Sequence, residues 1–433
     1  MNPTRHHSRR QFLCATSGAA LSAAVLGPFT IGAPPAPERP KKKATIALIA
    51  TEVRKHSHAQ HFIDRFVEGY GWHGRHHYPA VELGALYVDQ FPEGDLSRDR
   101  AKRHGLRLYP SVQEAITRGT SRLAVDGVVI IGEHGKYPRN EKGQTLYPRH
   151  RFFTETVEVF ERSKRSVPVF NDKHLSTRWD ECVEMVQTAR RLDFPFLAGS
   201  SLPVTWRIPG LEIPLDTPLV ESVCVCYGGV DSYDFHGLET AQCMSERRRG
   251  GESGISTVRA LRGPAVWERL EQSAQTRDLF AAALARSFTM RAAAGYTSGS
   301  PSLEAARHAC TDPVAYFFEH RDGFRTAMFL MNGLVTDFTY AGRRRDGEIV
   351  SCQMFLPMPG SVSTTADFFN PLVNHIETLV LKRKTPYPVE RTLLTSGMTL
   401  FAVESLFRGQ AQLPTPELAV AYRAVEPSAF WRA

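Results

Sequence analysis

The sequence predicts an α/β protein: an N-terminal, Rossmann-like doubly wound parallel sheet, followed by a C-terminal α+β domain with an antiparallel sheet. Up to about residue 200, short apolar runs alternate with amphipathic segments, as they do where helices cover both faces of a parallel sheet. Beyond Pro203, strand-like segments follow one another through tight polar turns, which is typical of antiparallel sheets. A chain of 433 residues is long enough for two such domains.

Five apolar runs of strand length lie in the first half of the chain, and each is bounded by polar loops. Such runs are typical of parallel strands that are buried on both faces. We expect strands at residues 44–50, 81–88, 126–131, 167–170 and 194–197. Between them, Ser111 and Glu114 have the spacing of a capping box, which predicts a short helix to residue 118. Two further segments carry apolar residues at helical spacing: Phe153, Val157 and Phe160, and then Trp179, Val183 and Val186.

The second half predicts a different arrangement. We expect strands at residues 220–227, 314–319, 325–331, 335–341 and 349–356, and helices at 266–287, 371–381 and 390–406. Asp346-Gly347 has the composition of a hairpin turn between two of these strands. The predicted domains are residues 44–200, of the nucleotide-binding type, and residues 201–433, for substrate and oligomer contacts. The final helices are expected to pack back on the first domain.

Residues 8–13 (Ser-Arg-Arg-Gln-Phe-Leu) are typical of a twin-arginine export signal, because two adjacent arginines precede an apolar pair and a run of small residues. Gly18, Gly27 and Pro28 interrupt this run, so we expect no stable membrane span. A linker rich in proline and lysine completes the predicted signal and linker segment, residues 1–43. These features predict a periplasmic or otherwise extracytoplasmic protein that folds before export. The alternative is a chance pair of arginines in a disordered tail.

The net charge of +8 comes mostly from the N-terminal segment. Residues 1–43 hold seven Lys or Arg and one acid, which leaves only +2 for the remainder. This excess is too small for the basic face of a nucleic-acid-binding protein, and we interpret the triple arginines at 247–249 and 343–345 as solvated turns. Apart from Cys14, none of the six cysteines forms a Cys-x-x-Cys pair, so we expect buried apolar residues rather than a metal site.

The turn after the first expected strand reads Ala-Thr-Glu-Val-Arg-Lys at residues 50–55. A dinucleotide site needs Gly-x-Gly-x-x-Gly here, so that backbone N–H groups can approach the pyrophosphate. Glu52 stands at the middle glycine position, where its carboxylate would repel the pyrophosphate. Thr51 in this turn and Asp89, which ends the second strand and would bind ribose hydroxyls, are candidate cofactor contacts. The alternative for Asp89 is an acid that caps the next loop.

A glycine- and histidine-rich segment, residues 69–77, looks inserted before Asp89. It places Asp89 at about twice the usual spacing of ~20 residues from the turn. His73, His76 and His77 suggest a metal site, but no carboxylate or cysteine stands close to them in sequence. We therefore expect a polar loop near the mouth of a pocket and no bound metal.

After the fourth expected strand comes Asp172-Lys173-His174, an acid–lysine pair at a strand end. Together with the order of strands and helices, this arrangement resembles the Gfo/Idh/MocA family of mostly nicotinamide-dependent sugar and polyol oxidoreductases, whose Glu-Lys-Pro motif falls on these residues. The resemblance implies that Lys173 lies between nicotinamide and substrate and lowers the pKa of the reacting hydroxyl, with Asp172 as a cofactor contact. His174 replaces the proline of the motif. The alternative for Lys173 is a surface lysine after a strand.

The family's second signature, Asp-x-Gly-x-His-x-x-Asp, falls on residues 232–239. His236 and Glu239 match its last two positions, whereas Ser232 replaces the first acid and Asp234 the glycine. The resemblance implies that His236 transfers the proton or contacts the substrate, a role that suits a side chain with a pKa near neutrality. Asp234 and Glu239 are then candidate substrate contacts. The alternative for His236 is a structural residue at the start of a helix.

Two loops have no counterpart in the family pattern. Residues 132–151 follow the third strand, and ligands bind at the carboxyl ends of parallel strands, so we expect His150 to contact the substrate. Residues 246–254 are rich in charge and glycine, which suits hydrogen bonds to a polyol or carboxylate. The alternative for residues 246–254 is a flexible hairpin.

The resemblance extends over residues 44–423 and implies an exported oxidoreductase that uses NAD or NADP on a sugar or polyol. Lys173 and His236 would be its catalytic residues, and we expect a homo-oligomer. The degenerate turn at Glu52 favours an alternative on the same fold, namely a cofactor-independent sugar-binding protein or an enzyme of elimination or isomerisation. A structural partner in an exported complex is a third hypothesis.

Overall fold

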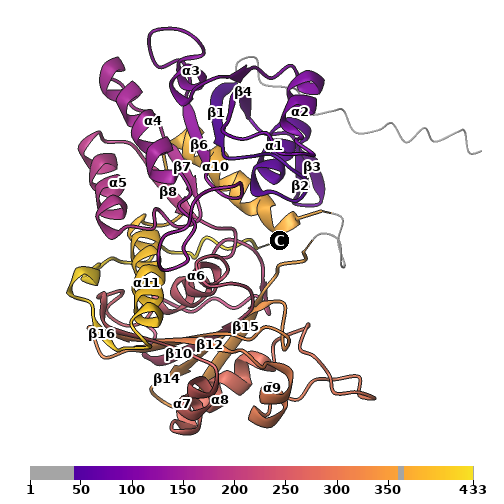
Figure 1. Cartoon of the computed structure of the whole chain (residues 1–433), viewed down its shortest axis with the longest axis vertical. Helices are drawn as coiled ribbons and strands as arrows, with labels where there is room; N and C mark the ends of the chain where they lie inside the picture. The colour runs from indigo at the N-terminus through magenta and orange to yellow at the C-terminus, as the bar shows by residue number, and fades with distance from the viewer. Residues whose placement is uncertain (1–42, 359–364, 433) are drawn as a thin grey trace, which may run out of the picture. The chain divides into compact units, whose positions relative to one another are not determined.

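The computed structural model describes residues 43–358 and 365–432 (Figure 1). The predicted export signal and Cys14 lie outside the described residues. Within those ranges, no helix combines the length and the apolar character needed to cross a lipid bilayer.

The first sheet has six parallel strands in the order β5-β4-β1-β6-β7-β8. From β1 the order runs outward in both directions, so the sheet is doubly wound and the predicted fold is confirmed. Its central strands are mostly apolar, and Ile46 to Ala50 of β1 are fully buried. The strands are β1 (Ala44–Ala50), β4 (Val81–Val88), β5 (Leu108–Tyr109), β6 (Gly127–Ile131), β7 (Val169–Asp172) and β8 (Phe196–Gly199).

Helices cover both faces of this sheet. Phe62 of α1 and Leu372 of α10 are buried together on one face, and Phe152 of α4 and Met185 of α5 are buried on the other. As predicted, Ser111 caps α3, because its hydroxyl accepts a hydrogen bond from the backbone N–H three residues on. The segment that looked inserted is the hairpin β2 (Tyr70–Trp72) and β3 (Arg75–His77). The helices are α1 (His58–Glu68), α2 (Ser97–His104), α3 (Val112–Thr117), α4 (Arg149–Ser163), α5 (Trp179–Arg191) and α10 (Asn370–Lys382).

The second sheet has eight strands in the order β16-β11-β12-β13-β10-β14-β15-β9. All neighbouring strands are antiparallel except β10 and β13, which run parallel, so the sheet is mixed. The strands are β9 (Arg207–Ile208), β10 (Leu219–Cys226), β11 (Ile255–Arg262), β12 (Val314–His320), β13 (Arg325–Leu330), β14 (Phe338–Arg344), β15 (Ile349–Met354) and β16 (Leu413–Pro414).

The second sheet also carries helices on both faces. In Figure 1, α6 (Asp234–Ser245) and α11 (Glu390–Phe407) lie between the two sheets, and α7 (Pro264–Glu271), α8 (Ala274–Leu284) and α9 (Leu303–Ala309) lie on the opposite face. The single helix expected at 266–287 is therefore wrong in detail. Helix α7 ends with Gln272 as its C-cap. Ser273 then caps α8 by accepting a hydrogen bond from the Thr276 N–H. Two 3-10 turns, Asp367–Phe369 and Pro416–Leu418, complete the elements of the described chain.

Candidate active site

A pocket of about 160 Å³ is lined by residues that follow β1, β6 and β7 and by the start of α6. This is the edge at which open α/β sheets bind ligands. His56, His134 and Lys173 in its lining have φ angles of 64°, 71° and 70°. Non-glycine residues are held in this left-handed region at a cost of about 1–3 kcal/mol each, and they cluster at functional sites. The polar residues of the lining are His56, His58, His61, Glu133, His134, Lys173, Ser201, Tyr233 and His236.

Lys173 is the first residue after β7, and it is only 3% exposed. Its backbone N–H donates a hydrogen bond to the carbonyl of Gly199, the last residue of the neighbouring strand β8. Gly199 itself has a φ of 120°, a conformation that only glycine adopts without strain. The side chain reaches across the pocket, so that Nζ lies 2.6 Å from Nε2 of His236. The two predicted catalytic residues are therefore in direct contact.

His236 lies in the first turn of α6, a helix whose side chains are all buried. Burial and, second, the charge of Lys173 lower the pKa of His236 well below its ordinary value, so the ring is neutral. A neutral ring that accepts the Lys173 hydrogen bond at Nε2 carries its proton on Nδ1. This Nδ1 is buried and has no hydrogen-bond partner among the described residues. A buried N–H group of this kind is a candidate hydrogen-bond donor to a ligand.

Glu133, the second residue after β6, balances the charge of Lys173. Its Oε1 lies 3.6 Å from Lys173 Nζ, and its Oε2 lies 3.2 Å from a guanidinium nitrogen of Arg149. Burial alone would raise the pKa of Glu133, but the charges of Lys173 and Arg149 outweigh it and hold the pKa below its usual range. The pocket therefore contains a fixed carboxylate between two cations.

Asp172, a predicted cofactor contact, points to a histidine instead. Its Oδ2 lies 2.7 Å from Nδ1 of His58, and its Oδ1 is buried without a partner in the described chain. His134 lies beside this pair, with its ring centroid 5.5 Å from that of His58. Burial lowers the pKa of His134 to about 3, and its Nε2 also has no partner among the described residues. Asp172 thus positions the ring of His58, one of several histidines around Lys173.

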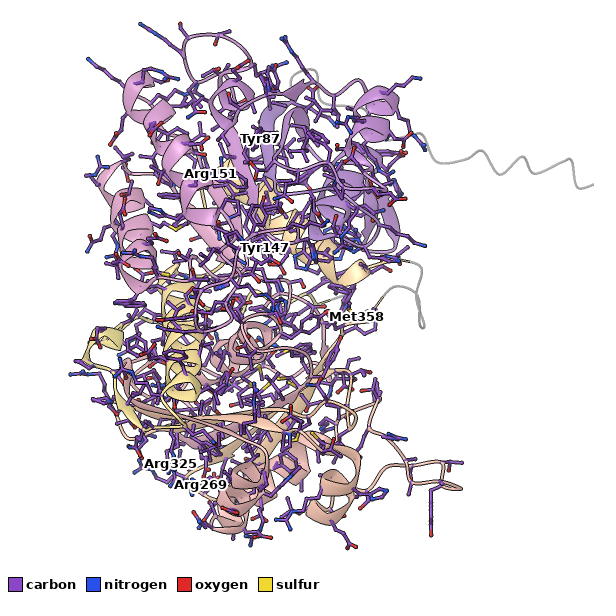
Figure 2. The ribbon with its side chains drawn as sticks, in the orientation of Figure 1. Tyr87, Tyr147, Arg151, Arg269, Arg325 and Met358 are labelled. Carbon is purple, nitrogen blue, oxygen red and sulfur yellow. The ribbon has the colours of Figure 1, made fainter. Side chains whose placement is uncertain are left out.

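Thr51 and Asp89, the other predicted cofactor contacts, are engaged within the protein. The Thr51 hydroxyl donates a hydrogen bond of 2.5 Å to the carbonyl of Glu133. The carboxylate of Asp89 accepts hydrogen bonds from Tyr87 (2.6 Å), Tyr137 (2.7 Å) and Arg151 (2.7 Å). Figure 2 labels Tyr87 and Arg151, which lie near each other in the first half of the chain. Burial opposes ionisation of Asp89, but these three hydrogen bonds lower its pKa overall.

The turn after β1 is packed rather than open. Glu52 is buried, and its Oε1 accepts a hydrogen bond of 2.6 Å from Arg54. Val53 is fully buried, and its carbonyl accepts a hydrogen bond of 2.8 Å from the backbone N–H of Leu96. Helix α1 starts only at His58, after Ser57 as its cap. The buried side chain of Glu52 thus stands where a glycine turn has none.

Asp234, a predicted substrate contact, anchors α6. Its carboxylate accepts hydrogen bonds from the backbone N–H groups of Asp231, Ser232 and Phe235, and from the hydroxyl of Tyr316. This buried carboxylate holds the start of the helix and, through it, positions His236. Because these four groups hydrogen-bond the carboxylate of Asp234, they give no support for its predicted contact with a substrate, which stays a prediction.

His150, also predicted to contact the substrate, lies on α4. Its Nε2 is 3.1 Å from the carboxylate of Glu184 on α5, and the ring is not part of the pocket lining. The substrate role of His150 stays a prediction.

Glu239, the third predicted substrate contact, is buried one helical turn beyond His236. Its Oε2 accepts hydrogen bonds from the backbone N–H of Ser200, at 2.9 Å, and from the Ser200 hydroxyl. Burial raises the pKa of Glu239 from 4.5 to about 7. Oε1 is a further buried atom without a partner in the described part of the chain.

This raised pKa predicts a pH-dependent stability. In the unfolded chain Glu239 ionises near its ordinary pKa, so between that value and about 7 only the folded state keeps the proton. The free energy of unfolding therefore falls as the pH rises through this window, by on the order of 3 kcal/mol. We expect Glu239→Gln to lose much less stability than the wild type between about pH 5 and about pH 8 in urea unfolding. Glu158→Gln, at an exposed position of α4, is the control and should follow the wild type. Equal slopes for Glu239→Gln and the wild type would contradict the expectation.

In the loop 246–254, the interpretation of residues 247–249 as a solvated turn is wrong for two of the three arginines. Hydrogen bonding of this loop to a polyol or carboxylate stays a prediction. Arg247 and Arg248 are each 2% exposed. Arg248 pairs with Glu252 at 2.9 Å, and Glu252 also pairs with His320 at 3.0 Å. The arginines are buried because the second sheet and the C-terminal segment supply acids and carbonyls for them. The sequence around the triple arginine carries no sign of these distant partners.

Glu133, His134, His58 and Arg149 were not predicted as site residues. One signal was present: Gly132-Glu133-His134 directly follows the third strand, at a carboxyl end where ligands bind. His58 carried no such signal, because it reaches the pocket only through the packing of α1. No group of three histidines, cysteines or acids in the described ranges could hold a metal ion.

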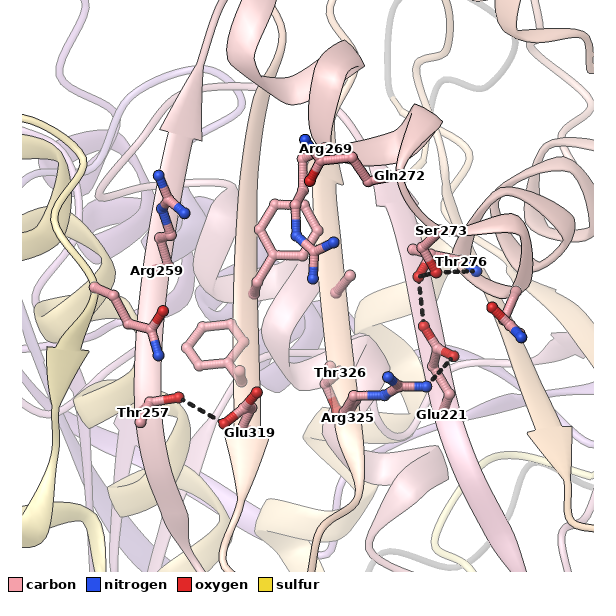
Figure 3. A pocket seen from close by; sticks show the side chains of 15 residues that line it. Glu221, Thr257, Arg259, Arg269, Gln272, Ser273, Thr276, Glu319, Arg325 and Thr326 are labelled. Carbon is pink, nitrogen blue, oxygen red and sulfur yellow. Dashed lines mark hydrogen bonds and ion pairs between the residues drawn. The ribbon is translucent and has the colours of Figure 1, made fainter.

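A second and larger pocket, of about 460 Å³, lies on the second sheet next to α7 and α8 (Figure 3). Its polar side chains pair with one another: Glu221 accepts hydrogen bonds from Thr276 (2.6 Å) and Arg325 (3.0 Å), and Thr257 donates one to Glu319 (3.3 Å). It therefore lacks the buried, unpaired groups that surround Lys173. We take the smaller pocket as the candidate active site.

The doubly wound first sheet and the mixed second sheet give this chain the fold of several solved dehydrogenases. No protein-family model matches the chain, and no curated protein matches it. Among solved structures, GenD2 from gentamicin A biosynthesis, in complex with NAD, matches with a TM-score of 0.52 and 11% identity over 88% of this chain and 99% of GenD2. A probable dehydrogenase from Thermotoga maritima has a TM-score of 0.52 and 11% identity over 86% of this chain and 99% of its own. The scyllo-inositol dehydrogenase of Lactobacillus casei has a TM-score of 0.50 and 10% identity over 86% and 98%.

These likenesses confirm the predicted fold, and GenD2 shows that the fold binds NAD. In this chain, two of the places where a dinucleotide would be held are filled by the protein's own groups. Glu52, at the middle glycine position of the turn, is buried, and Asp89 already accepts three hydrogen bonds. These residues do not fit the dinucleotide contacts of the glycine motif, so we derive no reaction step through NAD. Binding of NAD or NADP by this chain stays a prediction.

Proposed function

We propose that this chain is an exported enzyme that moves a proton from a hydroxyl group of a sugar or polyol at Lys173 and His236. The contact of 2.6 Å between Lys173 Nζ and His236 Nε2, inside a buried pocket at the carboxyl edge of the first sheet, carries the proposal. It supports acid–base chemistry because one group is a hydrogen-bond donor and the other a neutral ring that accepts.

The roles follow from the charges. A substrate hydroxyl that enters between the two groups accepts a hydrogen bond from the Lys173 ammonium, whose charge stabilises the developing alkoxide. The hydroxyl proton moves to Nε2 of the neutral His236, which becomes imidazolium. Glu133, 3.6 Å from Lys173, keeps a negative charge in the pocket and stabilises both cations. Asp234 holds α6, and with it His236, in place.

Two kinds of reaction fit this pair of residues. The fold favours oxidation of the alcohol, in which NAD or NADP would be the hydride acceptor. The packed turn at Glu52 and the hydrogen-bonded carboxylate of Asp89 favour the second candidate, a redox-neutral elimination or isomerisation. In that case His236 would take a proton from carbon, and the Lys173 ammonium would stabilise the oxygen anion or protonate the leaving oxygen. A protein that only binds sugar is the limiting case of the second candidate.

The nucleotide content of the protein tests this choice. We would purify the chain from its native export pathway without added nucleotide, denature it, and measure released NAD(H) and NADP(H) by mass spectrometry. Near-stoichiometric release is the expected result for the oxidoreductase. The absence of release, together with no thermal shift on adding either nucleotide, would exclude it and leave the redox-neutral candidate.

Location and assembly belong to the same proposal. The twin-arginine signal at residues 8–13 supports a periplasmic or extracytoplasmic location, which cell fractionation tests. We also propose a homo-oligomer that associates through the outer face of the second sheet, where the pocket of Figure 3 lies. Light scattering of the purified protein would show a monomer if this is wrong.

A further inference from the structure

Three tryptophans from distant parts of the sequence meet beside the hairpin β2–β3. Trp72 lies at the end of β2, Trp206 precedes β9, and Trp431 lies near the C-terminus. The rings of Trp72 and Trp431 are stacked, with centroids 4.6 Å apart and planes at 17°. The ring of Trp206 packs against that of Trp431 at a tilted angle. All three are only partly buried. We call these three residues the tryptophan cluster.

The tryptophan cluster lines a surface depression of about 480 Å³. Polar groups surround the rings, namely Arg75, His76 and the side chains of Asp367 and Asn370. An aromatic floor with a polar rim matches a sugar ring, whose C–H face is apolar and whose edge carries hydroxyls. Nε1 of Trp431 is also buried and without a partner among the described residues.

A groove connects this depression with the candidate active site. A third depression, of about 520 Å³, shares His56 and His61 with the pocket around Lys173. At its other end it shares His76, Asp367 and Asn370 with the depression at the tryptophan cluster. The three depressions therefore adjoin one another along α1 and the hairpin β2–β3.

The floor of this groove is rigid and its charge is mixed. Asn370 donates a hydrogen bond of 3.0 Å to the Gly71 carbonyl and accepts one of 2.6 Å from Arg65, which fixes its side chain. Basic and acidic side chains alternate along the lining, which includes Lys55, Arg65, Asp64 and Glu68. Such a lining offers a neutral polyhydroxyl ligand both donors and acceptors, whereas a phosphate or polyanion would meet three carboxylates, those of Asp64, Glu68 and Asp367.

We propose that the groove binds an oligosaccharide or glycoside, with the reacting sugar at Lys173 and His236 and a further sugar unit stacked on the tryptophan cluster. This inference rests on the proposed function for the reacting unit and adds that the substrate is longer than one sugar. The cluster lies outside the reacting site, so it selects substrates by length and leaves the proton transfer unchanged.

The test compares sugars of increasing length. Binding of glucose, galactose and mannose and of their α- and β-linked di- and trisaccharides would be measured by calorimetry on the full exported chain. We expect affinity to rise about tenfold or more from a monosaccharide to its trisaccharide in at least one series, as stacking of one ring on an aromatic face allows. Trp72→Ala should remove this gain and leave monosaccharide affinity unchanged. Trp72→Phe, which keeps an aromatic face, should retain part of the gain.

Tyr296→Ala is the matched control, because Tyr296 is an exposed aromatic residue 74% accessible to solvent and far from the groove lining. It should bind every sugar like the wild type, and thermal unfolding of all variants verifies their folding. Equal affinity for short and long sugars in every series would overturn the inference, as would a length gain that survives in Trp72→Ala. Binding of AMP at Trp72 in place of any oligosaccharide would also overturn it.

The same variants separate this inference from the proposed function. If Lys173→Met abolishes turnover while Trp72→Ala binds long sugars normally, the proposed function stands and the groove inference fails. If Trp72 controls the length dependence while Lys173→Met keeps full turnover, the groove inference stands and the proposed function fails.

Discussion

Replacement of Lys173 by methionine is expected to lower turnover of the sugar substrate by about two to four orders of magnitude. Methionine fills much the same volume but has no charge, so it can neither donate to the substrate oxygen nor stabilise the alkoxide. Turnover would be followed by NMR in deuterated water, which detects oxidation, elimination and isomerisation alike. In the same variant, His236 loses the nearby cation that lowers its pKa. We therefore expect the acidic limb of the pH–rate profile to shift to higher pH.

Lys136→Met is the matched control, because Lys136 is an exposed lysine in the loop after β6 and is absent from the pocket lining. It should keep wild-type turnover and the wild-type pH profile. Thermal unfolding should show that Lys173→Met remains folded. A folded Lys173→Met variant with turnover close to the wild type would contradict the proposed role of the Lys173–His236 pair.

Replacement of Arg248 by leucine is expected to lower the free energy of unfolding by about 3–5 kcal/mol. Arg248 is 2% exposed and forms two hydrogen bonds, at 2.9 and 3.0 Å, with the fully buried carboxylate of Glu252. Its removal leaves that carboxylate with His320 and Gln242 as its remaining side-chain partners. A buried charge that loses its partner is far more costly than the pair is favourable. Urea unfolding measures the change.

Two further variants sharpen this test. Arg249→Leu changes the neighbouring exposed arginine and should alter the free energy of unfolding by less than about 0.5 kcal/mol. Arg248→Leu combined with Glu252→Gln should recover part of the loss, because no uncompensated charge remains in the core. A change below about 1 kcal/mol in Arg248→Leu alone would show that water or other groups replace the guanidinium.

Local sequence patterns were sufficient to predict the elements whose composition differs from that of the residues on either side. β1 and β4 have the predicted bounds, because each is an apolar run between polar residues, and Ser111 caps α3 as its spacing indicated. Helix α6 was not predicted because all its side chains are buried, so it has no polar face and no helical period in its apolar residues. β11 was missed for a related reason: the glycine-rich charged segment before it suggested a loop.

The candidate site shows the same division. The acid–lysine pair at the end of the fourth strand and the histidine at 236 were recognisable from their motifs, because their spacing from the flanking strand and helix is local. Their contact at 2.6 Å across 63 positions depends on how α6 packs under the first sheet. His58, Glu133 and the tryptophan cluster are likewise assembled by segments far apart in the chain.

Short-range regularities thus indicated the fold class and the order of many elements along the chain, because periodicity and capping act within a few residues. The reactive roles of Lys173 and His236 came from the family resemblance and stay a prediction. Three features depended on long-range packing: the packed state of the turn after β1, the burial of particular arginines, and the position of the groove. A buried arginine such as Arg248 is stable only beside Glu252, Asp322 and His320, and a sequence window around it contains just one of these three. The physical reason is that desolvation and charge pairing are properties of the assembled interior, whereas strand and helix patterns are properties of the chain.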